Sequence, residues 1–213
     1  MREKRINEKN PQTFSISGEE LDDAVSRAKK GNVEAFQKLY EHYGRKILNY
    51  IYRMTGSREE AEDLTQDTFI LAYTNLSSLK ENIKFQSWLF RIAQNNVYQK
   101  YRGKRPPMDS IQQEETPGLS EVQKFATPQI SPEDRVLSKE LEQVIEQVIS
   151  QLPDKYKEVF VLSAIHKLSY KEISDMVGRS LASVKSDIHR ARVEVRDKIK
   201  TYLGENYGMS NLF

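Results

Sequence analysis

A single stretch decides the fold of the C-terminal half of this chain: residues 168–192 read LSYKEISDMVGRSLASVKSDIHRAR. Ile173 and Val177 lie four residues apart, which is typical of a short amphipathic helix, and Gly178 then supplies a turn residue. In the next segment an apolar residue recurs every three or four positions, at Val184, Ile188, Ala191, Val195 and Ile199. Two such helices around a tight turn predict a helix-turn-helix, whose second helix enters the DNA major groove.

The polar side of the second helix is basic. Residues 179–200 carry seven basic and three acidic side chains. Successive residues of a helix are about 100° apart, so some of the polar side chains point away from the apolar stripe. Side chains on that outer side can contact DNA phosphates and base edges. We therefore expect DNA contacts from Ser186, His189 and Arg190, with Ser183 and Lys185 beside them. Asp187 is expected at one side of this arc, where it would weaken the attraction for phosphate. The alternative is a solvated basic helix in a small bundle.

Proline placement divides the rest of the chain. Five of the seven prolines fall between Pro106 and Pro132, in a segment rich in Gln, Ser and Glu, and helix interiors exclude proline. We find no strand-like alternation, so the predicted fold class is all-α, with two helical domains joined by a flexible linker. The predicted boundaries are an extension at 1–20, a first domain at 21–105, a linker at 106–135, a second domain at 136–203 and a tail at 204–213.

Helical periodicity runs through both domains. The first domain shows an apolar stripe at Phe36, Leu39, Tyr40, Tyr43, Ile47, Leu48 and Ile51. Ser57 and Glu60 have capping-box spacing, and the helix that follows is expected to turn Ala61, Leu64, Thr68, Leu71 and Ala72 inward. A third helix from about Gln86 would bury Trp88, Leu89, Ile92, Ala93 and Val97. In the second domain we expect a helix that stops at Pro153, another from about Lys155 to His166, and the two helices described above.

Composition and charge distribution limit the classes of function that this chain can have. Formal net charge is only +2, but the segments differ: 31–105 carries 12 basic and 8 acidic residues, 106–135 carries 2 and 6, and 136–213 carries 12 and 11. The near-neutral total therefore conceals a basic first domain and an acidic linker. The absence of cysteine excludes disulfides, thiolate metal sites and cysteine nucleophiles. No signal peptide and no long apolar run is found, so we expect a cytoplasmic protein without a membrane span.

Two charged segments of the first domain are further candidates. Residues 58–67 hold five carboxylates and one basic residue, most of them in the first turns of a helix, where its dipole favours negative charge. Asp63, Gln66 and Asp67 fall close together there, so a protein-docking surface is favoured over a metal or acid–base site. Residues 91–105 hold five basic and no acidic residues beside several aromatic rings. Rings and positive charge together suit single-stranded DNA, and an ordinary basic helix with core aromatics is the alternative.

These motifs resemble the extracytoplasmic-function (ECF) sigma factors of bacterial RNA polymerase. AFQKLY at 35–40, EDLTQDTF at 62–69 and FQSWLFRIAQN at 85–95 are similar to region 2 of that family, and the stretch from Gln151-Leu-Pro to Arg192 is similar to region 4. The resemblance implies an alternative sigma factor that binds core RNA polymerase and promoter DNA. It implies no enzymatic activity, no cofactor and no metal. An anti-sigma factor that clamps both domains is a further expected partner.

The resemblance also implies roles for individual residues. The clamp helices of the largest polymerase subunit would bind Asp63, Leu64, Gln66, Asp67 and Phe69, and the flap of the second subunit would contact the second domain. The −10 element would be bound and melted by Asn82, Lys84, Phe85, Gln86, Trp88, Arg91, Asn95, Asn96, Lys100 and Arg102. The −35 element would be read by Arg179, Ser183, Lys185, Ser186, His189 and Arg190. Gln99 and Asp187 depart from the residue types common in the family.

Two other classes of function compete with this interpretation. An autonomous helix-turn-helix regulator explains the C-terminal half but leaves the blocks at 63–69 and 85–95 without a role. A helical adaptor that binds only proteins does not explain the basic arc of the last helix. The chain also lacks the GxxxxGK[ST], GxGxxG, HExxH and GxSxG motifs, so an enzyme is not expected.

Overall fold

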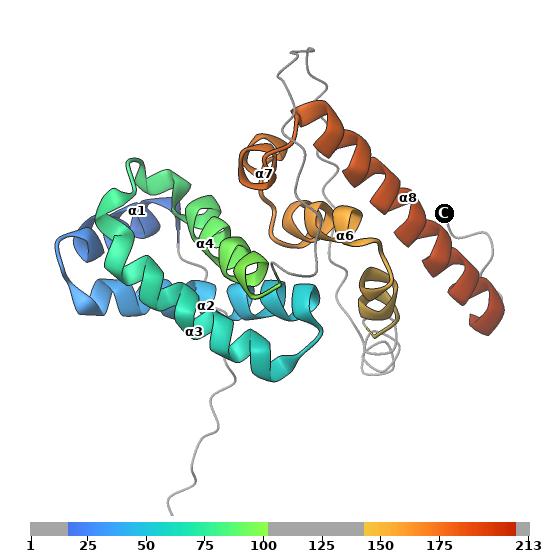
Figure 1. Cartoon of the computed structure of the whole chain (residues 1–213), viewed down its shortest axis with the longest axis horizontal. Coiled ribbons are helices and arrows are strands. Elements are labelled where there is room, and N and C mark those ends of the chain that lie inside the picture. The colour runs from blue at the N-terminus through green and yellow to red at the C-terminus, as the bar shows by residue number, and fades with distance from the viewer. Residues whose placement is uncertain (1–16, 102–142, 208–213) are drawn as a thin grey trace, which may run out of the picture.

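The computed structural model describes residues 17–101 and 143–207, and both ranges are built of helices without strands (Figure 1). The predicted all-α class with two helical domains is confirmed. The linker at 106–135, the first 16 residues of the extension and the last six residues of the tail lie outside the described residues.

The first domain is a bundle of four α-helices. They are α1 (Gly18–Lys29), α2 (Val33–Thr55), α3 (Arg58–Asn75) and α4 (Phe85–Lys100), with short 3-10 turns η1 (Leu76–Ser78) and η2 (Asn82–Lys84) between the last two. Side-chain caps fix where three of them begin. Ser17 forms a capping box with Glu20, so α1 begins inside the predicted extension. Asn32 caps α2, and Ser57 caps α3 as expected.

Most residues of the predicted apolar stripes are buried, and the clearest differences lie on α2, α3 and α4. Leu71 is 42% exposed, because Thr68 and Ala72 occupy the buried side of α3. Tyr40 is 50% exposed, because its ring lies on the edge of Phe69 at the surface of the bundle, with ring centroids 4.7 Å apart. On α4, Phe90 is fully buried while Trp88 and Ile92 are half-buried, because α4 is covered on a second side by the other domain.

The second domain contains the predicted helix-turn-helix. A helix at 143–150 is followed by α6 (Asp154–Phe160), a π-helical turn η3 (Val161–Ile165), α7 (Tyr170–Val177) and α8 (Leu181–Tyr207). Ser169 and Glu172 form a capping box that starts α7. Gly178 ends α7 with φ 65°, a left-handed conformation that only glycine adopts without a steric penalty. The last helix continues past the apolar stripe predicted at 184–199 and ends at Tyr207.

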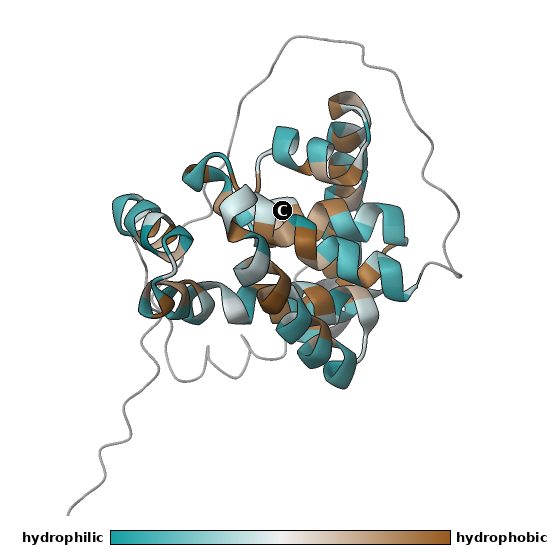
Figure 2. Ribbon diagram, turned by 60° about the vertical axis from the view of Figure 1, so that its left-hand side comes forward, coloured by the Kyte–Doolittle hydropathy of each residue, from teal (hydrophilic) through white to brown (hydrophobic). Residues whose placement is uncertain are grey.

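The two domains are in contact. Their buried apolar residues form one continuous cluster, with α4 against α7 and α2 against α6 (Figure 1). Figure 2 shows hydrophobic residues gathered where helices face one another and hydrophilic residues on the outer faces. In Figure 1, α8 lies on the side of the second domain that is far from the first. This arrangement decides which of the predicted binding residues are exposed.

Candidate DNA and polymerase interfaces

The N-terminal part of α8 presents the basic arc expected for a recognition helix. Ser186, His189 and Arg190 are exposed, and Ser183 and Lys185 are half-buried beside them. Val184 and Ile188, on the opposite side, are fully buried against the domain core. Arg190 donates to the Tyr156 hydroxyl at 3.3 Å, and this hydrogen bond raises the pKa of the guanidinium. Five of the six predicted −35 residues therefore share one accessible surface.

Arg179, the sixth, has a different environment. Its guanidinium donates to Asp187 Oδ2 at 2.6 Å, and the two side chains are only 10% and 3% exposed. The expected effect of Asp187 on phosphate attraction is wrong, because this carboxylate is buried and paired rather than placed at the edge of the arc. Lys155 Nζ lies 3.4 Å from the same oxygen. The ion pair joins the turn to the recognition helix and so holds the helix in place.

Exposed polar side chains run along α4. Arg91, Asn95 and Lys100 are exposed on this helix, and Lys84 is exposed just before it. The Glu81 carboxylate lies 2.7 Å from Lys84 Nζ, and this contact raises the pKa of the lysine. Trp88 is half-buried, with its ring centroid 5.9 Å from that of Phe85.

Three other predicted −10 residues are used inside the fold. Phe85 is fully buried, because it fills the core beside Tyr43. Asn96 is 8% exposed and donates to Thr68 Oγ1 at 3.0 Å, so it joins α4 to α3. Gln86 donates to the carbonyl of His166 in the second domain at 2.7 Å. Arg102 lies outside the described residues.

The turn before α4 is anchored to α1 through Asn82. Its amide donates to Ser26 Oγ at 2.6 Å, and its carbonyl oxygen accepts from Lys29 Nζ at 2.7 Å. The next residue, Ile83, is 83% exposed, a high value for an apolar side chain. Sequence reasoning missed Ser26, Lys29 and Ile83, since nothing in their local pattern shows that a helix some 55 residues earlier supports this turn.

The outer face of α3 combines acidic and apolar groups. Asp63, Gln66 and Asp67 are exposed as expected, whereas Leu64 and Phe69 are only 7% and 5% exposed. The last two pack in the core and position the helix rather than form its outer surface. Ile70, Leu71 and Tyr73 on α3 and the neighbouring Tyr40 on α2 are exposed apolar residues, and sequence reasoning did not predict their exposure. The α3 face, as we call Asp63, Gln66, Asp67, Ile70 and Leu71, therefore offers both charge and apolar area.

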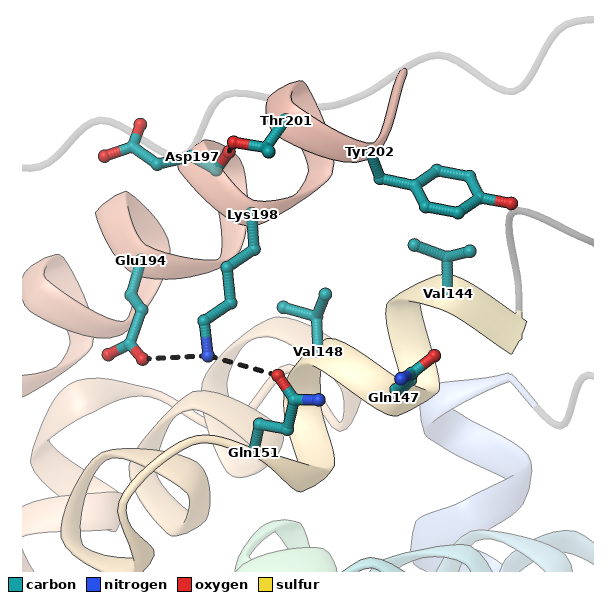
Figure 3. Close-up of a pocket in the computed structure, with 9 residues that line it drawn as sticks. All are labelled: Val144, Gln147, Val148, Gln151, Glu194, Asp197, Lys198, Thr201 and Tyr202. Atoms are coloured by element: carbon teal, nitrogen blue, oxygen red, sulfur yellow. Dashed lines mark hydrogen bonds and ion pairs between the residues drawn. The ribbon is translucent and has the colours of Figure 1, made fainter. Parts of the chain in front are cut away.

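A pocket of about 480 Å³ opens between the helix at 143–150 and α8 (Figure 3). Lys198 reaches from α8 toward the opposite helix, with Nζ 3.3 Å from Glu194 Oε1 and 3.4 Å from Gln151 Oε1 (Figure 3). The pocket is lined by Val144, Gln147, Val148, Gln151, Glu194, Asp197, Lys198, Thr201 and Tyr202. This lining contains no histidine, and within 17–101 and 143–207 no group of three or more His, Asp or Glu could hold a metal ion. No helix in the described ranges is long and apolar enough to cross a membrane.

Comparison with known proteins shows which families this chain resembles. Residues 39–106 match the Sigma-70 region 2 family, and residues 142–195 match the Sigma-70, region 4 family. Over 178 residues the chain is 39% identical to the ECF RNA polymerase sigma factor SigW of Bacillus subtilis, covering 83% of this chain and 95% of the relative. It is 32% identical over 178 residues to the ECF RNA polymerase sigma-E factor of Haemophilus influenzae, covering 83% and 93%.

Solved structures share the fold. CnrH, solved in complex with the cytosolic domain of CnrY, is similar with a TM-score of 0.60 and 24% identity over 85% of this chain and 98% of that one. The sigma factor RpoE of Bartonella quintana, solved with the anti-sigma factor NepR, has a TM-score of 0.57 and 19% identity over 79% and 98%. Regulators and adaptors of other classes do not account for these matches. The chain belongs to the ECF sigma factors of bacterial RNA polymerase and is an alternative sigma factor that directs transcription initiation.

Proposed function

We propose that this sigma factor docks core RNA polymerase with the α3 face, binds the −10 element with η2 and α4, and reads the −35 element with the exposed arc of α8. The observation that carries the proposal is the arc itself, where Ser186, His189 and Arg190 point outward from a helix seated by Val184 and Ile188. Serine and arginine side chains at such positions reach base edges in the major groove. The chain would carry out no reaction itself, and its place of action would be the cytoplasm.

The −10 assignment is narrower than the sequence suggested. Lys84, Arg91, Asn95 and Lys100 are exposed and would bind the DNA strand, and the half-buried Trp88 would offer its ring for stacking. Phe85, Asn96 and Asn82 would support these residues from the core and from α1. We further propose the predicted domain limits, with the first domain extended to Gly18. We also propose an anti-sigma factor as a partner, since RpoE was solved with the anti-sigma factor NepR and CnrH with the cytosolic domain of CnrY.

The direct test is transcription from genomic DNA of the source bacterium, with its purified core polymerase and this chain. We expect new 5′ ends that core polymerase alone does not produce, with shared sequences near −10 and −35 upstream. If the chain binds duplex DNA tightly on its own but produces no specific starts with core polymerase, the proposal fails and a DNA-binding regulator is the better description.

The α3 face provides a test of polymerase docking. Asp63→Arg reverses a charge on an exposed position, so we expect core polymerase affinity to fall about tenfold while helix content stays unchanged. Asp23→Arg, at an exposed site on α1, is the control and is expected to bind core polymerase like the wild type. Affinity is measured by fluorescence anisotropy of the labelled sigma factor. Undiminished affinity of the Asp63 variant would remove α3 from the interface.

The arc of α8 provides a test of −35 reading. Arg190→Ala is expected to weaken binding to a −35 duplex, taken from a promoter found in the transcription experiment, by about 1–3 kcal/mol if the guanidinium contacts a base. Arg196→Ala, six residues further along the same helix and 56% exposed, is expected to cost much less. Electrophoretic mobility shift with the full chain measures both. Equal affinity for the Arg190 variant and the wild type would place this side chain in solvent.

A further inference from the structure

The side chain of Arg190, which is proposed to read the −35 element, is held by a residue outside its own helix. Its guanidinium donates to the hydroxyl of Tyr156 at 3.3 Å. Tyr156 belongs to α6, which packs against α8, so this hydrogen bond crosses from one helix to the other (Figure 1). The contact therefore links the exposed arc of α8 to the first turn of α6.

Tyr156 is fixed in place by packing. Its ring is half-buried against the apolar cluster of the domain, and Val159 and Phe160, one turn further along α6, are buried. The ammonium group of Lys155 lies 5.9 Å from the centroid of the ring. A tyrosine has only two side-chain torsions, so a packed ring also fixes its hydroxyl. An exposed arginine, in contrast, has many rotamers and loses entropy when it is ordered. The fixed hydroxyl can therefore order Arg190.

The two acidic residues nearest to Arg190 along α8 are paired with other cations. The Asp187 carboxylate, one turn before Arg190, lies 2.6 Å from the guanidinium of Arg179. The Glu194 carboxylate, one turn after Arg190, lies 3.3 Å from Lys198 Nζ. Residues three or four positions apart on a helix are within reach of one another, so either acid could otherwise pair with Arg190. The other cations thus keep both acids away from this guanidinium.

A tyrosine hydroxyl holds an arginine without cancelling its charge. A phenol is uncharged near neutral pH, and one hydrogen bond to it occupies only one of the several N–H donors of a guanidinium. The remaining donors can make a two-pronged contact with a guanine edge or a phosphate. A carboxylate at the same place would also fix the guanidinium, but it would compete with the DNA for that positive charge.

We propose that Tyr156 is a positioning residue for −35 reading: its hydroxyl orders the Arg190 guanidinium on the DNA-facing side of α8 and leaves the positive charge available to the DNA. The inference rests on the proposed −35 role of Arg190 and adds to it a residue of α6. Ordering a side chain before binding reduces the entropy that is lost on binding. Because this gain acts through Arg190, Tyr156 contributes to −35 affinity only while Arg190 is present.

The test removes the hydroxyl and keeps the ring. Tyr156→Phe is expected to weaken binding of the full chain to the −35 duplex about threefold to tenfold, the range for one hydrogen bond. In an Arg190→Ala chain the same substitution is expected to have no further effect, because the side chain that it orders is gone. The control is Tyr202→Phe, which removes a hydroxyl from another half-buried tyrosine, twelve residues further along α8, and is expected to bind like the wild type. Electrophoretic mobility shift measures all four chains.

Base preference separates positioning from a general structural role. A panel of −35 duplexes, each with one substituted base pair, identifies the position at which Arg190→Ala loses discrimination. Tyr156→Phe is expected to lose part of the discrimination at that position and to keep it at the others, while its urea midpoint stays close to that of Tyr202→Phe. Undiminished affinity, equal losses with and without Arg190, or a loss spread over all base pairs would overturn the positioning role.

A measurement on the free chain tests the ordering itself. Nuclear magnetic relaxation at arginine Nε atoms reports the order of each side chain, and Arg190→Lys identifies the Arg190 signal by its absence. We expect Arg190 to be more ordered in the wild type and in Tyr202→Phe than in Tyr156→Phe. Equal order in all three chains would overturn the inference. Because this measurement needs neither DNA nor polymerase, and the transcription test does not depend on Tyr156, failure of this inference and failure of the proposed function are distinguishable.

Discussion

Replacing Arg179 by alanine is expected to destabilise the second domain by about 3–5 kcal/mol, the range for removing one partner of a buried ion pair. The guanidinium is 10% exposed and lies 2.6 Å from Asp187, which is 3% exposed. Without Arg179 the carboxylate stays buried, and its remaining cation, Lys155, is 3.4 Å away and 56% exposed. Urea unfolding of the full chain, followed by far-ultraviolet circular dichroism, measures the loss as a lower midpoint.

Two companion variants identify the cause. Arg192→Ala removes an exposed arginine from α8, the helix that carries Asp187, and is expected to change stability by no more than about 0.5 kcal/mol. Arg179→Met combined with Asp187→Leu removes both charges and is expected to recover most of the loss, because apolar pairs of similar volume often replace buried ion pairs without cost. An Arg179→Ala chain that keeps its stability but loses −35 affinity would show that this guanidinium faces DNA.

Acid is expected to weaken the protein through His166. Burial first, then the charges of Arg53 and Lys46 on α2, lower the pKa of this imidazole from 6.5 to about 3. Its Nε2 atom is buried without a hydrogen-bond partner among the described residues. Between pH 6.5 and 3, His166 binds a proton in the unfolded chain but stays neutral in the folded chain. Stability is therefore complete above pH 6.5 and falls with decreasing pH, by about 2 kcal/mol at pH 5.

The measurement compares urea unfolding at pH 8 and pH 5. His166→Phe keeps a ring against Phe90 and Tyr50 but cannot titrate, so we expect it to lose about 2 kcal/mol less than the wild type over this interval. His189→Gln removes the exposed histidine of α8 and is expected to lose as much as the wild type. Identical losses in the wild type and the His166 variant would mean that His166 titrates normally in the folded protein.

Local signals in the sequence were sufficient for the fold. The cap at Ser57, the glycine at 178 and the spacing of apolar residues act over three or four positions, so they could be interpreted before the chain is folded. The capping box expected at Glu60 is only half present. The Glu60 carboxylate is instead contacted by Tyr101 and Lys100, from the far end of α4.

The binding residues were less predictable because their exposure depends on distant packing. Asn96 and Asn95 are adjacent and chemically identical, yet the first joins α4 to Thr68 and only the second is exposed. The angular positions of these two residues on the helix could not predict which one is exposed, because α4 is covered on two sides. The Arg179–Asp187 pair likewise joins a residue of the turn to a residue of α8, so the periodicity of one helix does not relate them. The spacing of apolar residues within each domain also does not predict that the second domain packs against α4.

Trp88 gives the molecule a built-in optical probe. It is the only tryptophan in the chain, it is half-buried beside Phe85, and it lies on the helix that contacts the second domain and is proposed to meet DNA. Excitation at the red edge of protein absorbance therefore selects one indole in one known position. Emission wavelength and quenching by acrylamide can therefore follow the surroundings of α4 in the unlabelled, unmodified chain, in real time and on addition of DNA.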